Sequence, residues 1–135
     1  MSFYDFSKDE RIKLVAEINA VILSEIKKGK HTNILAYFSD EDTYIRKTAY
    51  QAIGKIYKTD EKLQKAILIL LEKLSKDKNE KVRQTEVNAA GEIGMKDFAS
   101  ISKFMETGLF DAHHSVRNAV IGSIKKMGEK NPGLF

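Results

Sequence analysis

The sequence predicts an all-α fold: a right-handed α–α superhelix of about seven helices that forms a single domain over residues 1–135. Three observations favour this class. One pattern of 18 residues occurs three times, no segment alternates with the period of a strand, and the one proline, Pro132, lies outside every expected helix interior. Helical units that repeat at this spacing stack on one another, because none can bury its own apolar face alone.

The repeated pattern covers residues 40–57, 77–94 and 111–128. In each copy an aspartate lies six residues before an arginine, a branched apolar residue precedes that arginine, and another apolar residue follows ten positions after it. The arginines are 37 and 34 residues apart. The aspartate–arginine pairs are Asp40 and Arg46, Asp77 and Arg83, and Asp111 and Arg117.

This spacing resembles the second helix of a HEAT repeat, which has Asp, a short gap, Val-Arg, and then Ala and Gly at fixed offsets. The resemblance implies a HEAT-like (armadillo-like) solenoid, and it indicates the fold rather than a particular task. In the central copy we expect Gly91 to let a neighbouring helix approach closely. We expect Gly94 to end the helix in the left-handed conformation.

The elements follow from capping residues and helical periodicity. Ser7 and Glu10 form a capping box at the start of the first helix, and Gly29 ends it. The expected helices cover residues 7–28, 32–38, 43–58, 59–76, 80–94, 97–108 and 114–128. They group into N-terminal helices (7–38) and repeat units over about 32–58, 60–94 and 97–130.

Composition limits the function classes. The chain has 42% hydrophobic and 31% charged residues, a net charge of +4 and no cysteine, so disulfides and thiolate metal sites are excluded. We find no signal peptide and no membrane-spanning apolar run, which favours a cytoplasmic location. The basic balance permits an acidic partner such as nucleic acid.

The end of the chain predicts an open surface. Residues 131–135 are similar to the start of another turn and helix, and no later helix would cover Val120 and Ile124. Since terminal repeats of a solenoid normally have a polar outer face, we expect that the chain is truncated at its C-terminus; the alternative is that this end meets a partner, including a second copy.

No constellation for catalysis, a metal or a cofactor is present. The Asp–Arg pairs recur at equivalent positions, whereas an active site is normally unique, so we interpret them as a structural ladder between units. His113 and His114 are adjacent and diverge on a helix, so they favour a turn or cap role over metal binding. We therefore expect a protein that is not an enzyme.

A polar stripe on the repeated helices is the candidate binding surface. One and five residues after the motif arginines stand Lys47 and Gln51, Gln84 and Asn88, and Asn118 and Gly122. Lys55 and Lys58 extend the stripe in the first copy, and Lys126 in the third. Stacked on a concave face, the amides could bind a peptide backbone and the lysines could contact phosphates, although a merely solvated face remains an alternative.

Residues 116–132, which begin within the third copy and run past its end, are similar to the repeat of bacterial DNA alkylation-repair glycosylases that ends in Asn-Pro. That resemblance implies a basic groove that holds duplex DNA. It does not extend to the reaction, because the chain has no tryptophan and no counterpart of the Trp–Asp catalytic segment.

The sequence therefore predicts a non-enzymatic binding module. The leading partner is duplex DNA, contacted at its phosphates through Lys47, Lys55, Lys58 and Lys126. The alternative is a protein-interaction scaffold that uses Gln51, Gln84, Asn88 and Asn118. A DNA glycosylase is the least favoured alternative.

Overall fold

The computed structural model describes residues 2–135, and this part of the chain contains seven α-helices, two 3-10 turns and no strand. The helices are α1 (Lys8–Lys28), α2 (Thr32–Phe38), α3 (Thr43–Thr59), α4 (Gln64–Leu74), α5 (Glu80–Gly94), α6 (Phe98–Leu109) and α7 (His114–Lys130). The 3-10 turns are η1 (Phe3–Asp5) and η2 (Glu61–Leu63). The predicted all-α class with about seven helices is confirmed.

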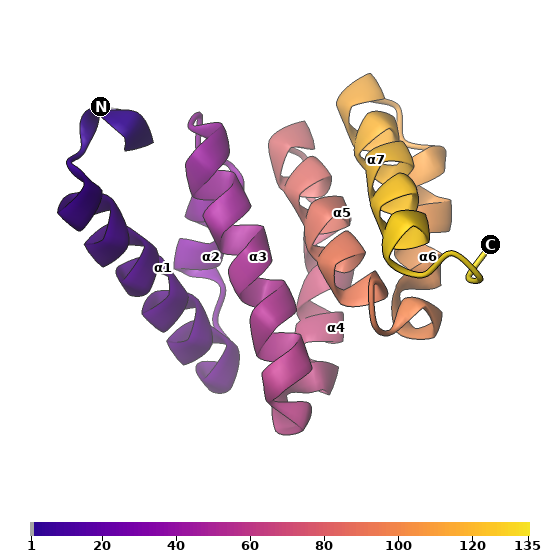
Figure 1. Ribbon diagram of the computed structural model, residues 1–135, viewed down its shortest axis with the longest axis horizontal. Helices are drawn as coiled ribbons and strands as arrows, with labels where there is room; N and C mark the ends of the chain where they lie inside the picture. The colour runs from indigo at the N-terminus through magenta and orange to yellow at the C-terminus, as the bar shows by residue number, and fades with distance from the viewer. Residues whose placement is uncertain (1) are drawn as a thin grey trace.

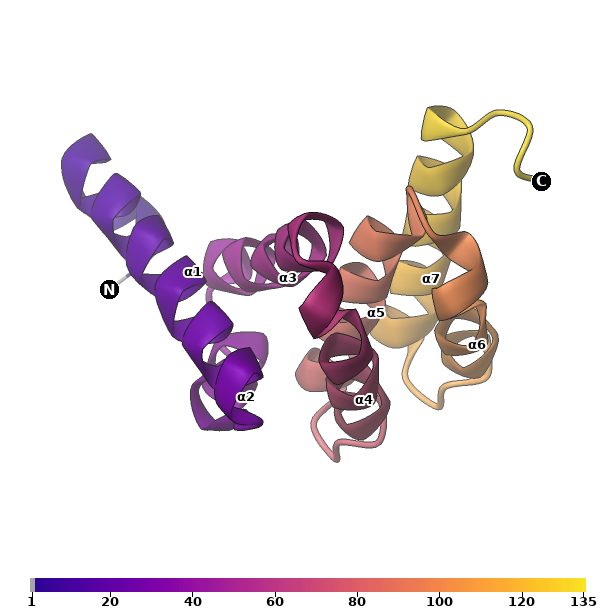
Figure 2. The ribbon, with the colours of Figure 1, turned by 90° about the horizontal axis from the view of Figure 1, so that it is seen from below.

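The helices form two layers. α1, α3, α5 and α7 lie side by side in one layer, and α2, α4 and α6 form a back layer behind them (Figure 1). Seen from below, α1 and α7 rise on either side of α3 and α5 (Figure 2). The three arginine-bearing helices α3, α5 and α7, here called the motif helices, thus share one layer, as a helical solenoid requires.

The core lies between the two layers and is centred on α5, which contacts α2, α3, α4, α6 and α7. Its inward side is made of apolar residues at helical spacing, including Val82, Ala89, Ala90 and Ile93, which are all at most 1% exposed. Burial of one such valine or isoleucine side chain stabilises the fold by about 1.5–3 kcal/mol.

Capping residues fix where the helices begin and end. Ser7 accepts a hydrogen bond from the Glu10 backbone N–H, and the Glu10 carboxylate accepts one from Ser7 in return, so the predicted capping box forms. Gly29 follows α1 with a φ of 69°, the left-handed conformation that favours glycine. Asp97 caps α6 by accepting a hydrogen bond from Ser100 N–H.

Glycines bring the motif helices close together. A Cβ atom added to Gly54 of α3 would lie 2.6 Å from Glu92 Cβ of α5, and one added to Gly91 of α5 would lie 2.6 Å from Ser123 Oγ of α7. Both glycines stand eight residues after their motif arginine. The expected close approach at Gly91 is therefore confirmed.

The prediction for Gly94 was wrong. Within residues 2–135 Gly29 alone has a positive φ, so Gly94 does not end α5 in the left-handed conformation. Gly94 is needed for space instead, because an added Cβ would collide with Met127 of α7 and lie 2.8 Å from Ile101 of α6.

The prediction that Val120 has nothing to cover it was also wrong. Val120 is 0% exposed, and it packs on Gly108 of α6, where an added Cβ would lie 2.5 Å from a Val120 methyl group. Ile124 is half-buried, and Ile121 is the isoleucine of α7 that is exposed, at 59%. The reason is that α6 folds over α7 within the same unit.

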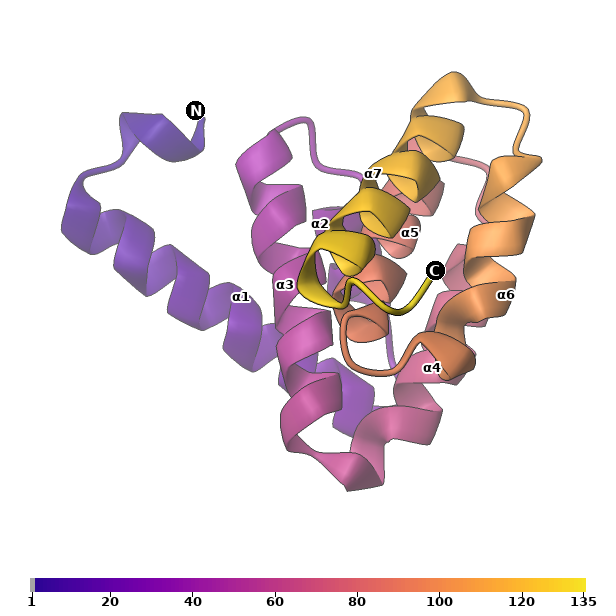
Figure 3. The same ribbon diagram turned by 45° about the vertical axis from the view of Figure 1, so that its right-hand side comes forward.

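The C-terminal segment Asn131–Phe135 forms a turn that comes back toward α6, and it forms no further helix within the described residues (Figure 3). The Asn131 side-chain amide donates to the Met95 carbonyl at 2.7 Å. The Phe135 ring meets the Phe98 ring edge-on at 5.3 Å between centroids. Over residues 2–135 we also find no helix with the length and apolarity to cross a bilayer.

Candidate binding face of the motif helices

Each motif helix begins with the same set of hydrogen bonds. The motif aspartate accepts from the backbone N–H two residues on, at 2.8 Å for Asp40 and 2.9 Å for Asp77 and Asp111. The arginine of each copy donates from Nη1 to the carbonyl of that same aspartate. These bonds satisfy polar groups at the turn and hold each helix start in one orientation.

The residue two after each motif aspartate is the N-cap. Asp42, Asn79 and His113 each accept a hydrogen bond from the backbone N–H two residues further on. His113 thus uses Nδ1 as a cap, and its ring stacks on His114 with centroids 4.7 Å apart. This confirms the predicted cap role, and no group of three metal-ligating side chains occurs in residues 2–135.

One arginine also joins two units. Arg83 Nε lies 2.9 Å from Asp111 Oδ2 and its Nη2 lies 3.2 Å from Oδ1. This is a bidentate hydrogen bond from α5 to the turn before α7. Burial opposes ionisation of Asp111, yet the Arg83 hydrogen bond lowers the pKa of this carboxyl below its usual value. For Arg46 and Arg117, no ion pair with an acidic side chain occurs in the described part of the chain.

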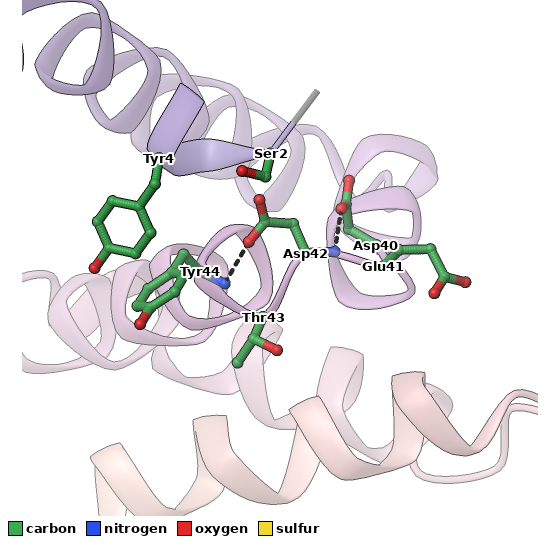
Figure 4. Close-up of a pocket in the computed structure, with 7 residues that line it drawn as sticks. All are labelled: Ser2, Tyr4, Asp40, Glu41, Asp42, Thr43 and Tyr44. Atoms are coloured by element: carbon green, nitrogen blue, oxygen red, sulfur yellow. Dashed lines mark hydrogen bonds between the residues drawn. The ribbon is translucent and has the colours of Figure 1, made fainter. Parts of the chain in front are cut away.

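A pocket of about 600 Å³ lies at the first of these turns, next to η1 (Figure 4). Two of its three acidic residues are used in local structure, because Asp40 accepts from Asp42 N–H and Asp42 accepts from the N–H groups of Tyr44 and Phe3. The third, Glu41, is exposed and forms an ion pair with Lys81 at 3.6 Å. The rings of Tyr4 and Tyr44 meet edge-on at 4.4 Å. The Asp40 and Asp42 carboxylates therefore build the turn rather than a ligand cage.

The face of the motif helices turned away from the back layer carries the predicted amides. Gln51 and Asn118 are exposed, and Gln84 and Asn88 are half-buried. None of the four makes a side-chain hydrogen bond within residues 2–135. The other five Asn and Gln side chains of the chain are all bonded: Asn19, Asn33, Gln64, Asn79 and Asn131.

The predicted lysines lie on the same layer but differ in their surroundings. Lys47, Lys55 and Lys58 are exposed and form no ion pair among the described residues. Lys126 Nζ lies 3.1 Å from Glu92 Oε2. Glu92, Lys55 and Lys126 all stand nine residues after their motif arginine, so one carboxylate lies between two lysines across the face.

Two acidic residues, one on the binding face and one in the core, were not predicted from the sequence. One is Glu92, which lies between Lys55 and Lys126 on the face of the motif helices. The other is Glu86, which is 2% exposed and leaves Oε1 without a hydrogen-bond partner. Burial, followed by the charges of Glu72 and Asp111, raises the Glu86 pKa well above its usual value. Aligning the three copies would have revealed Glu86, because the other two copies have the apolar residues Ala49 and Val120 at the same position.

Comparison with models of protein families gives a match to this chain. The model of a protein family described as non-SMC mitotic condensation complex subunit 1 matches residues 11–117. No curated protein and no solved structure matches the chain. The similarity to DNA alkylation-repair glycosylases thus receives no support.

Proposed function

This chain belongs to the Cnd1 family, that of the non-SMC mitotic condensation complex subunit 1, and from that premise we propose that it is a non-enzymatic helical-repeat module that binds a partner protein within a chromosome-associated assembly. The binding surface in this proposal is the face of α3, α5 and α7 that carries Gln51, Gln84, Asn88 and Asn118.

The main observation behind the proposal is which side-chain amides have a hydrogen-bond partner. The four on this face have no hydrogen-bond partner within residues 2–135, and the five elsewhere all have one. A primary amide both donates and accepts, so a row of free amides suits the alternating N–H and C=O groups of a peptide backbone. Half-burial of Gln84 and Asn88 restricts their rotamers before binding, which lowers the entropy cost of ordering them.

The test is affinity capture of partners with the wild-type chain and with the double variant Gln84→Ala/Asn88→Ala. We expect the variant to lose a partner that survives nuclease treatment. The matched control is Lys65→Ala/Lys73→Ala on α4, which changes two exposed side chains of the back layer. Equal capture by all three chains would refute the proposal.

DNA contact is the second candidate, favoured by Lys47, Lys55 and Lys58 on α3, which are exposed and form no ion pair within residues 2–135. Such contact would neutralise phosphates without reading bases, so its affinity should fall steeply as salt rises. Glu92 weakens this candidate, because its charge lies beside Lys126 and reduces the positive potential of the face. A duplex-binding titration at several salt concentrations tests it: no binding at low salt, or binding insensitive to salt, excludes it.

A further inference from the structure

An apolar groove runs along α1 where it diverges from α3. A cavity of about 610 Å³ lies between α1 and the C-terminal half of α3, and a smaller one of about 300 Å³ continues it along α1. Figures 1 and 2 show α1 leaning away from α3 toward its N-terminal end. Between its charged ends, the α1 side of the groove is lined by apolar residues and one asparagine: Ile12, Val15, Ala16, Asn19, Ala20 and Leu23.

The apolar lining is open to solvent. Ile12 is 59% exposed, and it lines both cavities together with Val15, so its exposed side chain belongs to a continuous apolar surface. Asn19, the polar residue between the charged ends on this side, already makes one hydrogen bond, because its amide donates to the Val15 carbonyl at 2.7 Å. An apolar occupant would therefore displace water without leaving the Asn19 amide unpaired.

The charges at the ends of the groove are mainly positive. Lys8 and Arg11 line one end, and Lys27 and Lys55 line the other. Asp60 is the one acidic residue among the lining residues, and its carboxylate already caps η2 by accepting from Lys62 N–H at 3.1 Å. Arg11 Cζ lies 5.3 Å from the centroid of the Tyr4 ring, over its face. This arrangement complements an occupant that is apolar in its middle and acidic at its ends.

The walls also restrict the backbone of the occupant. Both are helices, and along their interiors the backbone groups are bonded within the helix, so there they offer no free N–H or C=O to an extended strand. A helix satisfies its own backbone and can present one apolar stripe, so it is the form that fits. The distance from Lys8 to Lys27 along α1 corresponds to 19 residues, or roughly 29 Å at 1.5 Å per residue.

We propose that this groove binds an amphipathic helix of a partner protein, with an apolar stripe flanked at both ends by acidic residues. The proposal rests on the proposed function as a protein-binding module and specifies the partner's chemistry. It differs from that function in its residues, because the groove uses α1 and does not involve Gln84 or Asn88.

The test uses three designed 18-residue helical peptides and fluorescence anisotropy with the full chain. The first carries a leucine stripe with two glutamates at each end, the second has lysines in place of the glutamates, and the third has the first composition in an order without a stripe. We expect the first to bind saturably and the other two to bind at least roughly tenfold more weakly. Absence of saturable binding of the first peptide, or equal binding of the lysine-flanked peptide, overturns the proposal.

A pair of variants with matched exposure locates the site. Ile12→Glu in the groove and Ile121→Glu on α7 both alter an isoleucine that is 59% exposed, so neither should unfold the chain. We expect Ile12→Glu to weaken binding of the acid-flanked peptide at least roughly tenfold and Ile121→Glu to change it less than about twofold. Equal effects of the two variants would overturn the assignment to this groove.

Two further readouts separate the alternatives. Gln84→Ala/Asn88→Ala should leave peptide binding unchanged, so if it loses its captured partner while the wild-type chain binds no peptide, the groove proposal fails and the proposed function stands. Sedimentation of the free chain tests a second copy as the occupant. A dimer that Ile12→Glu dissociates would overturn the proposal in favour of self-association.

Discussion

The α5–α7 and α1–α3 interfaces belong to the same layer but are built differently. Between α5 and α7 the helices meet at Gly91, which lies against Ser123 with no room for a methyl group. α1 contains no glycine at all, and the larger residues Val15 and Leu23 line a groove beside α3. A glycine thus allows α5 and α7 to close on each other, whereas α1, which has no glycine, leaves an apolar surface beside α3 open for a partner.

The largest expected effect comes from filling the closed interface. Gly91→Ala places a Cβ 2.6 Å from Ser123 Oγ and 2.8 Å from its Cβ, so α5 and α7 must move apart. We expect the free energy of unfolding to fall by about 2–3 kcal/mol. Urea denaturation of both chains measures it.

A matched glycine in the same layer provides the control. Gly122 lies within α7 and has nothing within 4 Å of an added Cβ. Gly122→Ala should therefore raise stability by about 0.5–1 kcal/mol, the helical preference for alanine over glycine. If Gly91→Ala behaved like Gly122→Ala, the close contact of α5 and α7 would be excluded.

The next effect tests the ion pair that ties two units together. Arg83→Ala removes both contacts to Asp111, so we expect a loss of about 2 kcal/mol, against about 1 kcal/mol for Arg46→Ala, which removes turn contacts without an ion pair. Because the folded pKa of Asp111 is lowered, this stabilisation is present above the ordinary aspartate pKa and is lost as pH falls through the folded pKa. Equal losses for both variants at neutral pH, measured by denaturation, would contradict the cross-unit role.

Replacing Glu86 with an apolar residue is expected to stabilise the fold. The folded pKa of this buried carboxyl is raised, so protonation favours the folded chain, and wild-type stability falls as pH rises from the ordinary glutamate pKa to the folded one. Glu86→Val, which copies the residue at the equivalent position in α7, should raise stability at pH 7 by about 1–3 kcal/mol and less below pH 4. Thermal melts across this pH range measure the difference, and a destabilised variant at pH 7 would refute it.

The smallest effect concerns the exposed face. Lys126 forms a partly exposed ion pair with Glu92, so Lys126→Ala should change the free energy of unfolding by less than about 0.5 kcal/mol. Ile12→Ala in the open groove should be similarly neutral. A loss above 1 kcal/mol for either variant would show that these residues stabilise the fold rather than remain available for a partner.

The sequence predicted what depends on local periodicity and capping. The repeated Asp–Arg spacing located the three motif helices, and Ser7 and Gly29 marked the limits of α1. What it did not predict depends on distances between helices. Gly94 was assigned a left-handed φ because helix ends favour it, but Met127 and Ile101 from two other helices explain the glycine.

The same distinction applies to the candidate binding surfaces: positions that repeat along the sequence could be predicted, and those that depend on how the helices pack could not. The amide row could be predicted, because its positions repeat relative to the motif arginines. The groove beside α1 could not, because Ile12 belongs to the same apolar stripe as the buried Ile18 and Ile22, and only the tilt of α1 exposes it. Glu86 could have been found, since it interrupts a position that is apolar in both other copies.

Hydrogen exchange of the backbone amides tests most directly whether one layer contains both a closed and an open interface. The packing predicts that the amides of α5, which has helices on both sides and behind it, exchange most slowly, and that those of the first half of α1 exchange faster by at least roughly tenfold. Equal protection of α1 and α5 would contradict this difference, because α1 would then have to be packed as closely as α5.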